Sequence, residues 1–156
     1  MAARPDALPR PVDPERDRLR LWLRLLRLTR QIEGELRERL RVEFQTTLPR
    51  FDVLAALDRA QDGMMMSELS RMLMVSNGNV TGIVDRLVEE GSVLRSIRDG
   101  DRRASIVRLT EKGQRRFAEL AKAHKQWVGE LLAGIGGEET ALVTGLLERA
   151  LKDGEG

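Results

Sequence analysis

Apolar residues recur at steps of three and four between about Pro14 and about Val42, which predicts one long amphipathic helix. Leu21 and Leu23 widen the apolar surface in its first half, so more than one face of this helix must be shielded from water. Arginines between Arg18 and Arg30 interrupt every apolar run of the ~20 residues that a membrane span requires. We therefore expect a partner helix to cover the stripe, which comprises Leu19, Trp22, Leu25, Leu26, Leu28, Ile32, Leu36 and Leu40.

The middle of the chain predicts three short helices. Pro49 opens the first, Arg50–Ala60, and Asp62-Gly63 ends it as a turn. The next three residues, Met64 to Met66, fit a short strand or a packed loop equally well. Serines at helix-capping positions then predict two helices joined by a tight turn: Ser67 before Glu68–Met74, and Ser76 before Asn77–Glu90, which Gly91 ends.

A hairpin and two further helices complete the predicted fold. Val93–Ile97 and Ser105–Leu109 alternate apolar and polar residues on either side of a charged tip. Thr110 caps a helix that continues to about Leu132, and the last helix is Glu138–Leu151. The fold class is mainly α with a small β-hairpin wing (α+β), that is, a winged helix-turn-helix with N- and C-terminal dimerisation helices.

The predicted organisation has three parts. Residues 1–14 form a flexible, proline-rich arm that is neither a signal peptide nor a transit sequence. Residues 49–110 form the DNA-binding domain, and residues 15–48 and 111–156 form a helical dimerisation region. We expect a homodimer, because the apolar residues of the first and last helices exceed what one small core can cover. Those of the last helix are Leu142, Val143, Leu146, Leu147, Ala150 and Leu151.

Composition and charge narrow the function. The 156 residues include no cysteine, which excludes a disulfide framework, a thiolate nucleophile and cysteine-based sensing, and favours an intracellular, cytoplasmic location. The net charge of +2 conceals two basic stretches of +5 each, residues 16–41 and 95–116. A solvated helix face is the favoured interpretation of the first stretch. The second follows a helix-turn-helix, so we interpret it as a surface for the phosphates of DNA.

The helix after Ser76 has the chemistry of a DNA-recognition helix. Val80, Ile83, Val84, Leu87 and Val88 are expected to be buried, leaving an outer face with no acid before Asp85. Asn79 is the predicted base reader, because Asn pairs with adenine through two hydrogen bonds, and Ser76 should cap the helix near a phosphate. The predicted DNA-binding residues are Ser76, Asn77, Gly78, Asn79, Thr81, Gly82 and Arg86 from the helix, with Arg98, Arg102 and Arg103 from the wing.

At the wing, Arg102 or Arg103 is expected to enter the minor groove, whose negative potential attracts arginine. Arg95 and Arg98 can add phosphate contacts. Asp101 would be repelled by DNA, so its expected task is to hold an arginine in place. A dimer would set its recognition helices about one DNA turn apart, roughly 34 Å, and would therefore bind a double-stranded pseudopalindrome.

These segments together resemble the MarR family of transcriptional regulators over nearly the whole chain. The resemblance rests on Ser67–Ser70, Val75–Leu87, Asp99–Ala104 and Leu109–Gly113. It implies a homodimer held by the terminal helices, a palindromic operator and regulation, as a repressor, by a small effector. Many members have proline ahead of the wing's Asp-Arg-Arg, where this chain has Asp99 and Gly100, so which arginine inserts stays open.

The resemblance also implies an effector pocket where the first helix, the helix Arg50–Ala60 and the helix after Thr110 meet. The effector would be aromatic or anionic, with an aromatic acid or its acyl-CoA thioester as one candidate. The core is the favoured interpretation of Trp22 and Phe51, and a plain helix face that of His124. The candidate contacts are Trp22, Arg27, Arg30, Phe51 and His124.

An enzyme is disfavoured. His124 is the single histidine, and no glycine-rich phosphate loop, nucleophile motif or metal-ligand cluster accompanies it. We therefore expect no catalytic residue, no cofactor, no metal and no membrane partner. The alternative function is a winged-helix adaptor that binds protein without sensing an effector, but the arginines of the wing argue against it.

Overall fold

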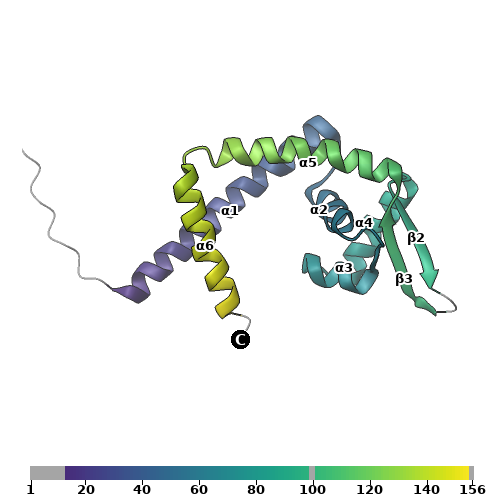
Figure 1. Cartoon of the computed structure of the whole chain (residues 1–156), viewed down its shortest axis with the longest axis horizontal. Helices are drawn as coiled ribbons and strands as arrows, with labels where there is room; N and C mark the ends of the chain where they lie inside the picture. Colours follow the sequence, from purple (N-terminus) through teal and green to yellow (C-terminus); the bar gives the residue numbers. More distant parts are fainter. Residues whose placement is uncertain (1–12, 99–100, 155–156) are drawn as a thin grey trace, which may run out of the picture. The chain divides into compact units, whose positions relative to one another are not determined.

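The computed structural model describes residues 13–98 and 101–154, apart from the side chains of residues 77, 98 and 101–104 (Figure 1). The chain forms two compact units, which meet between Glu35 and Leu36, inside the first helix. The elements, in order, are α1 (Pro14–Phe44), α2 (Leu48–Arg59), β1 (Met64–Met65), α3 (Met66–Leu73), α4 (Asn77–Glu89), β2 (Val93–Arg98), β3 (Asp101–Leu109), α5 (Glu111–Leu131) and α6 (Gly137–Asp153). The predicted mainly helical fold with a small sheet is confirmed.

The first unit contains the N-terminal part of α1. No side chain between Asp13 and Glu35 is buried, although the stripe predicted from the sequence is apolar. Trp22 is 57% exposed, so its interpretation as a core residue is wrong. Its apolar neighbours Leu19, Leu21 and Leu23 are also exposed. The long helix therefore forms as predicted, with its apolar surface uncovered in the single chain.

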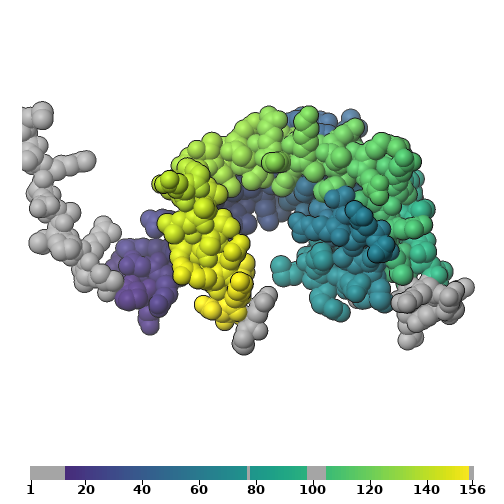
Figure 2. Space-filling view, in the orientation of Figure 1, coloured from purple at the N-terminus to yellow at the C-terminus, as the bar shows by residue number. Residues whose placement is uncertain are grey.

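The core lies in the second unit, where α2 packs against α5, and α3 and α4 pack on α2 and on each other. Figure 2 shows this cluster below the N-terminal half of α5. The three-stranded antiparallel sheet, in the order β1-β3-β2, flanks this cluster. The methionines before α3 supply its short edge strand, since Met64 pairs with Val107 and Met65 with Ile106. The fully buried side chains are Leu40, Val53, Leu54, Leu57, Leu69, Val80, Val84, Val93, Val107 and Leu120.

Helices α2 and α3 each start two residues before the predicted position. Helix α2 begins at Leu48 because Thr47 accepts a hydrogen bond from the Arg50 N–H (3.4 Å) and caps it. Helix α3 begins at Met66, so Ser67 lies inside its first turn and the prediction that Ser67 caps it is wrong. The Glu68 carboxylate instead accepts from the Met65 N–H (2.9 Å). In both cases an available hydrogen bond extended the helix toward the N-terminus.

Helix α6 stands apart from the cluster of α2 to α4 in Figure 2. It extends one residue before and two residues beyond the predicted Glu138–Leu151. None of its residues is buried, and its large apolar side chains are 39% to 70% exposed. The apolar surface predicted for the last helix is therefore present and uncovered, on the residues Leu142, Val143, Leu146, Leu147 and Leu151.

Candidate nucleic-acid interface

Helix α4 separates a buried face from a face of small and polar residues. Val80 and Val84 are fully buried and Leu87 is 2% exposed, which holds the helix against the core. Ile83 is only half-buried and Val88 is 37% exposed, so the predicted apolar stripe is narrower than expected. The side chain of Asn77 lies outside the described residues. The opposite face exposes the other predicted contacts, Ser76, Gly78, Asn79, Thr81, Gly82 and Arg86.

The exposed face of α4 is open at its glycines. A Cβ atom built on Gly78 or Gly82 would meet no atom within 4 Å outside the helix's own backbone. The fold therefore does not require glycine at either position. Small residues on a helix let its backbone approach base edges closely, so these glycines fit a groove-facing surface.

The N-terminus of α4 suits an anion. Ser76 caps the helix as predicted, because its hydroxyl accepts a hydrogen bond from the Asn79 N–H (3.4 Å). The first turn of α4 contains no acidic residue. The N–H groups and the positive end of the helix dipole can therefore receive a phosphate oxygen.

An ion pair joins α4 to the hairpin. The guanidinium of Arg95 on β2 lies 2.8 Å from the carboxylate of Asp85 on α4. Arg95 thus pairs with Asp85 in this structure, and its phosphate contact stays a prediction. Sequence patterns do not predict this pair, because Asp85 and Arg95 lie ten residues apart on different elements. The available signal was Asp85, the first acid along the exposed face of α4.

We expect this pair to position the hairpin relative to the helix. Arg95→Ala should weaken binding to duplex DNA by about two- to fivefold, because exposed ion pairs contribute ~0.2–1 kcal/mol. The double charge swap Asp85→Arg with Arg95→Asp should recover part of the loss, which fluorescence anisotropy with a labelled duplex can measure. Equal weakening in the swap and in Arg95→Ala would contradict a positioning role.

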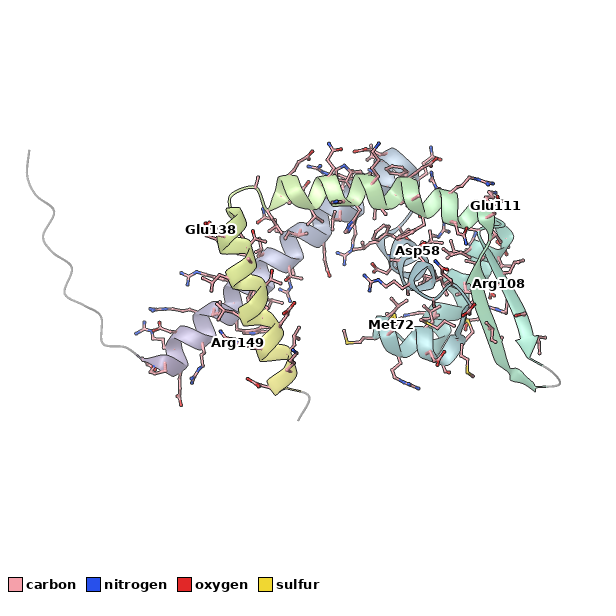
Figure 3. The ribbon with its side chains drawn as sticks, in the orientation of Figure 1. Asp58, Met72, Arg108, Glu111, Glu138 and Arg149 are labelled. Atoms are coloured by element: carbon pink, nitrogen blue, oxygen red, sulfur yellow. The ribbon has the colours of Figure 1, made fainter. Side chains whose placement is uncertain are left out.

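Hydrogen bonds join the base of the hairpin and the end of α4 to the start of α5. Thr110 caps α5 as predicted, accepting from the Gly113 N–H (2.9 Å), and its hydroxyl donates to the carbonyl of Gly91 (2.7 Å). Lys112 donates to the carbonyl of Glu90 (2.7 Å). Figure 3 shows Glu111 at the start of α5, at the base of the hairpin, with Arg108 on β3. The start of α5 therefore holds the end of α4 and the base of the hairpin together.

The outer part of the wing is described by its backbone only. Strands β2 and β3 pair Val93 with Leu109 and continue to Arg98 opposite Asp101, with an irregularity after Ile97. The strands are longer than the predicted Val93–Ile97 and Ser105–Leu109. The side chains of Arg98, Asp101, Arg102 and Arg103 lie outside the described residues, so their roles stay predictions.

Two of the five effector candidates lie together. The rings of Phe51 on α2 and His124 on α5 stack with centroids 4.4 Å apart, and Phe117 lies 5.7 Å from Phe51. Phe51 is 7% exposed, which agrees with its interpretation as a core residue. Burial lowers the pKa of His124 below its ordinary 6.5, so the ring is neutral at pH 7. The remaining candidates, Trp22, Arg27 and Arg30, are exposed in the first unit.

Other kinds of site are not found in the described part of the chain. No group of three or more His, Cys, Asp or Glu side chains there could hold a metal ion. No helix among the described residues has the length and apolar character that crossing a membrane requires.

Comparison with known proteins points to one family. The MarR family model matches residues 46–105, which include the helix-turn-helix and the wing. The chain is 30% identical over 137 residues to an uncharacterised HTH-type transcriptional regulator, YfiV, of Bacillus subtilis, covering 85% of this chain and 84% of the relative. It is 35% identical over 89 residues to the transcriptional activatory protein BadR of Rhodopseudomonas palustris, covering 55% and 51%. The chain thus spans about half of the length of that relative.

Solved structures agree with the sequence comparison. A MarR family transcriptional regulator from Silicibacter pomeroyi superposes with a TM-score of 0.75 at 32% identity, over 92% of this chain and 99% of the other. A cysteine-to-serine mutant of MarR from E. coli, complexed with operator DNA, gives a TM-score of 0.74 at 26% identity, over 90% and 99%. The arrangement of α4 and the hairpin therefore occurs in a protein solved on its operator.

Proposed function

Because this chain belongs to the MarR family of DNA-binding transcriptional regulators, we propose that it acts as a homodimeric repressor on a pseudopalindromic operator. The observation that carries the proposal is the outer face of α4, where Asn79 and Thr81 stand exposed between two unobstructed glycines. In this proposal residues 49–110 bind DNA in the cytoplasm. Asn79 reads bases, and Arg102 or Arg103 enters the adjacent minor groove.

The uncovered helices support the homodimer. The apolar side chains of α6 and of the N-terminal part of α1 are exposed to water in the single chain. Exposed apolar surface of this extent is typical of a protein interface. We therefore assign residues 15–48 and 111–156 to dimerisation, which doubles the recognition helix and requires an inverted repeat in the DNA.

Repression and release complete the proposal. A dimer that spans two half-sites excludes other proteins from that DNA, so an operator within a promoter gives repression. The relative BadR is named a transcriptional activatory protein. Expression of a reporter gene from the natural promoter, with and without this protein, distinguishes repression from activation. A small anionic or aromatic effector would release the DNA by binding better to the conformation that does not fit the operator.

The first experiment is selection of bound duplexes from a random pool at roughly physiological salt, where nonspecific phosphate binding is weak. We expect an enriched inverted repeat with half-sites about one turn apart. Absence of enrichment, from protein that sedimentation shows to be a folded dimer, would contradict operator binding and would favour the adaptor alternative.

The wing provides a separate prediction. The double substitution Arg102→Ala with Arg103→Ala should weaken binding to all duplexes and lower the slope of log affinity against log salt by about 0.9 for each lost phosphate contact. Titrations at several salt concentrations measure both quantities. An unchanged slope would remove the wing from the DNA-binding mechanism.

A further inference from the structure

The N-terminal part of α1 carries a row of arginines along one face. Arg16, Arg20, Arg24, Arg27 and Arg30 follow one another at steps of four and three residues. At about 100° per residue, these five positions fall within an arc of about 120° around the helix. The row extends over about 21 Å, because each residue advances a helix by about 1.5 Å. We call these five residues the arginine stripe.

Most of the charge of the arginine stripe is not neutralised. Residues 16–30 contain six arginines and one acid, Asp17, whose carboxylate lies 3.1 Å from the guanidinium of Arg20. The other four arginines of the stripe are exposed and make no ion pair with any residue that the structure describes. Other arginines of the chain do pair with a carboxylate: Arg39, Arg41, Arg50, Arg95, Arg115 and Arg116. The stripe is therefore a concentrated positive charge.

The spacing of these arginines is unfavourable for the chain alone. Residues three or four apart are neighbours on a helix surface, and like charges at that spacing destabilise the helix. A solvated helix face, which the sequence favoured for this stretch, leaves the repulsion uncompensated. A polyanion bound along the arginine stripe removes it, because one ligand neutralises several guanidinium groups.

The apolar surface of α1 lies on the other side of the helix. Leu25 is about 160° from the middle of the arginine stripe, with Trp22 and Leu28 on either side of it. In the proposed homodimer this apolar surface is buried, so the arginine stripe stays in contact with water. Two-fold symmetry then gives each dimer two such stripes.

The chemistry of the arginine stripe matches the phosphates of duplex DNA. Residues 16–30 contain no lysine, and the guanidinium group of arginine binds a phosphate through two parallel hydrogen bonds. A charged row of about 21 Å suits an extended polyanion, and duplex DNA carries one negative charge per ~1.7 Å of its axis. An anionic membrane would also bury the apolar surface of α1, which the homodimer uses.

We propose that the arginine stripe binds the phosphates of a second DNA duplex, so that one dimer bridges two DNA segments. The stripe belongs to the first compact unit, whereas α4 and the hairpin belong to the second. Each unit thus presents its own surface to DNA. The second duplex is bound without regard to its sequence, because phosphate contacts carry no sequence information. Bridging rests on the proposed function, whereas binding of DNA by the arginine stripe does not.

Capture of a second duplex tests the bridging. The full chain is loaded on beads that carry the selected operator, and a labelled duplex of unrelated sequence is added at roughly physiological salt. We expect the wild type to retain this duplex. The triple variant Arg24→Gln, Arg27→Gln and Arg30→Gln should retain about tenfold less, because three phosphate contacts are lost, with its affinity for the bare operator within about twofold of wild type. Equal retention by the wild type and the triple variant would overturn the proposal.

The matched control removes the same amount of charge elsewhere. Lys122→Gln, Lys125→Gln and Lys152→Gln are three substitutions at exposed positions of α5 and α6. This control should retain nearly as much of the second duplex as wild type. An equal loss in both triple variants would show that net charge alone attracts the second duplex, and would overturn the role of the arginine stripe.

A conservative variant guards against a folding artefact. Arg24→Lys, Arg27→Lys and Arg30→Lys keep the charge of the arginine stripe and should retain most of the second duplex. Retention as low as in the triple glutamine variant would contradict binding through charge.

Salt dependence tests the arginine stripe without an operator. With a random duplex, the triple glutamine variant should lower the slope of log affinity against log salt by about 0.9 for each lost phosphate contact, and the lysine control should not. An unchanged slope would overturn the stripe as a DNA surface. Failure of the operator selection would count against the proposed function alone, because this titration needs no operator.

Two other results would assign the arginine stripe to a different occupant. Weaker binding of the triple glutamine variant to an operator with long flanks, with no second duplex retained by wild type, would overturn bridging in favour of contacts to the same duplex. A second copy of the chain is the other candidate, because residues 137–156 carry a net charge of −3. A shift of the variant toward monomer in sedimentation, with retention of the second duplex unchanged, would overturn the proposal in favour of that contact.

Discussion

Gly82→Glu is expected to lower the affinity for the selected operator by at least about 100-fold without lowering the free energy of unfolding, since Glu has a higher helix propensity than Gly. Gly82 lies on the exposed face of α4, and a Cβ atom there meets nothing within 4 Å outside the helix. The fold therefore accommodates a longer side chain. On DNA, the new carboxylate would face phosphates and base edges at close range, and like-charge juxtaposition across an interface costs several kcal/mol.

The matched control is Gly129→Glu on α5, which introduces the same charge at another exposed helical glycine with open space around it. Its net charge change is identical, so the long-range electrostatic effect on DNA affinity is matched. Anisotropy titrations give the affinities and urea titrations give the free energies of unfolding. Comparable losses of affinity in both variants would show that the outer face of α4 does not meet the DNA.

Gly113→Ala should destabilise the fold by about 2–3 kcal/mol, since overpacking of a close contact costs this much. Gly113 lies in the first turn of α5, and a Cβ atom built on it would overlap the carbonyl group of Ser92. That carbonyl belongs to the backbone between α4 and β2 and accepts from the Thr110 N–H, so it cannot simply move aside. The substitution must therefore shift α5 away from the base of the wing.

Gly129→Ala on the same helix should instead raise the free energy of unfolding. Its Cβ atom has open space, and alanine in a helix interior is favoured over glycine by about 0.5–1 kcal/mol. Urea unfolding of the two variants and wild type measures both effects. If Gly113→Ala were as stable as Gly129→Ala, α5 would not approach the end of α4 as closely as described.

The capping residues of α4 and α5 were predictable because their hydrogen bonds are local. Ser76 bonds to a backbone N–H three residues away, and Thr110 does the same. The outer face of α4 was equally predictable, since burial of Val80 and Val84 at helical spacing leaves Thr81 and Gly82 between them exposed. The start of α3 was not, because a serine and a glutamate in neighbouring positions offered competing caps and Glu68 prevailed.

By itself, the sequence determined the order of elements, the caps of α4 and α5, the face of α4 that is free for DNA and the apolar surplus of the first and last helices. Only the tertiary structure decided which distant side chains meet: Asp85 with Arg95, Phe51 with His124, and Arg50 with Glu90. The physical reason is range. Helical periodicity and capping act over three or four residues, whereas these contacts join residues ten to seventy-three positions apart and exist only once α2, α4, β2 and α5 have packed.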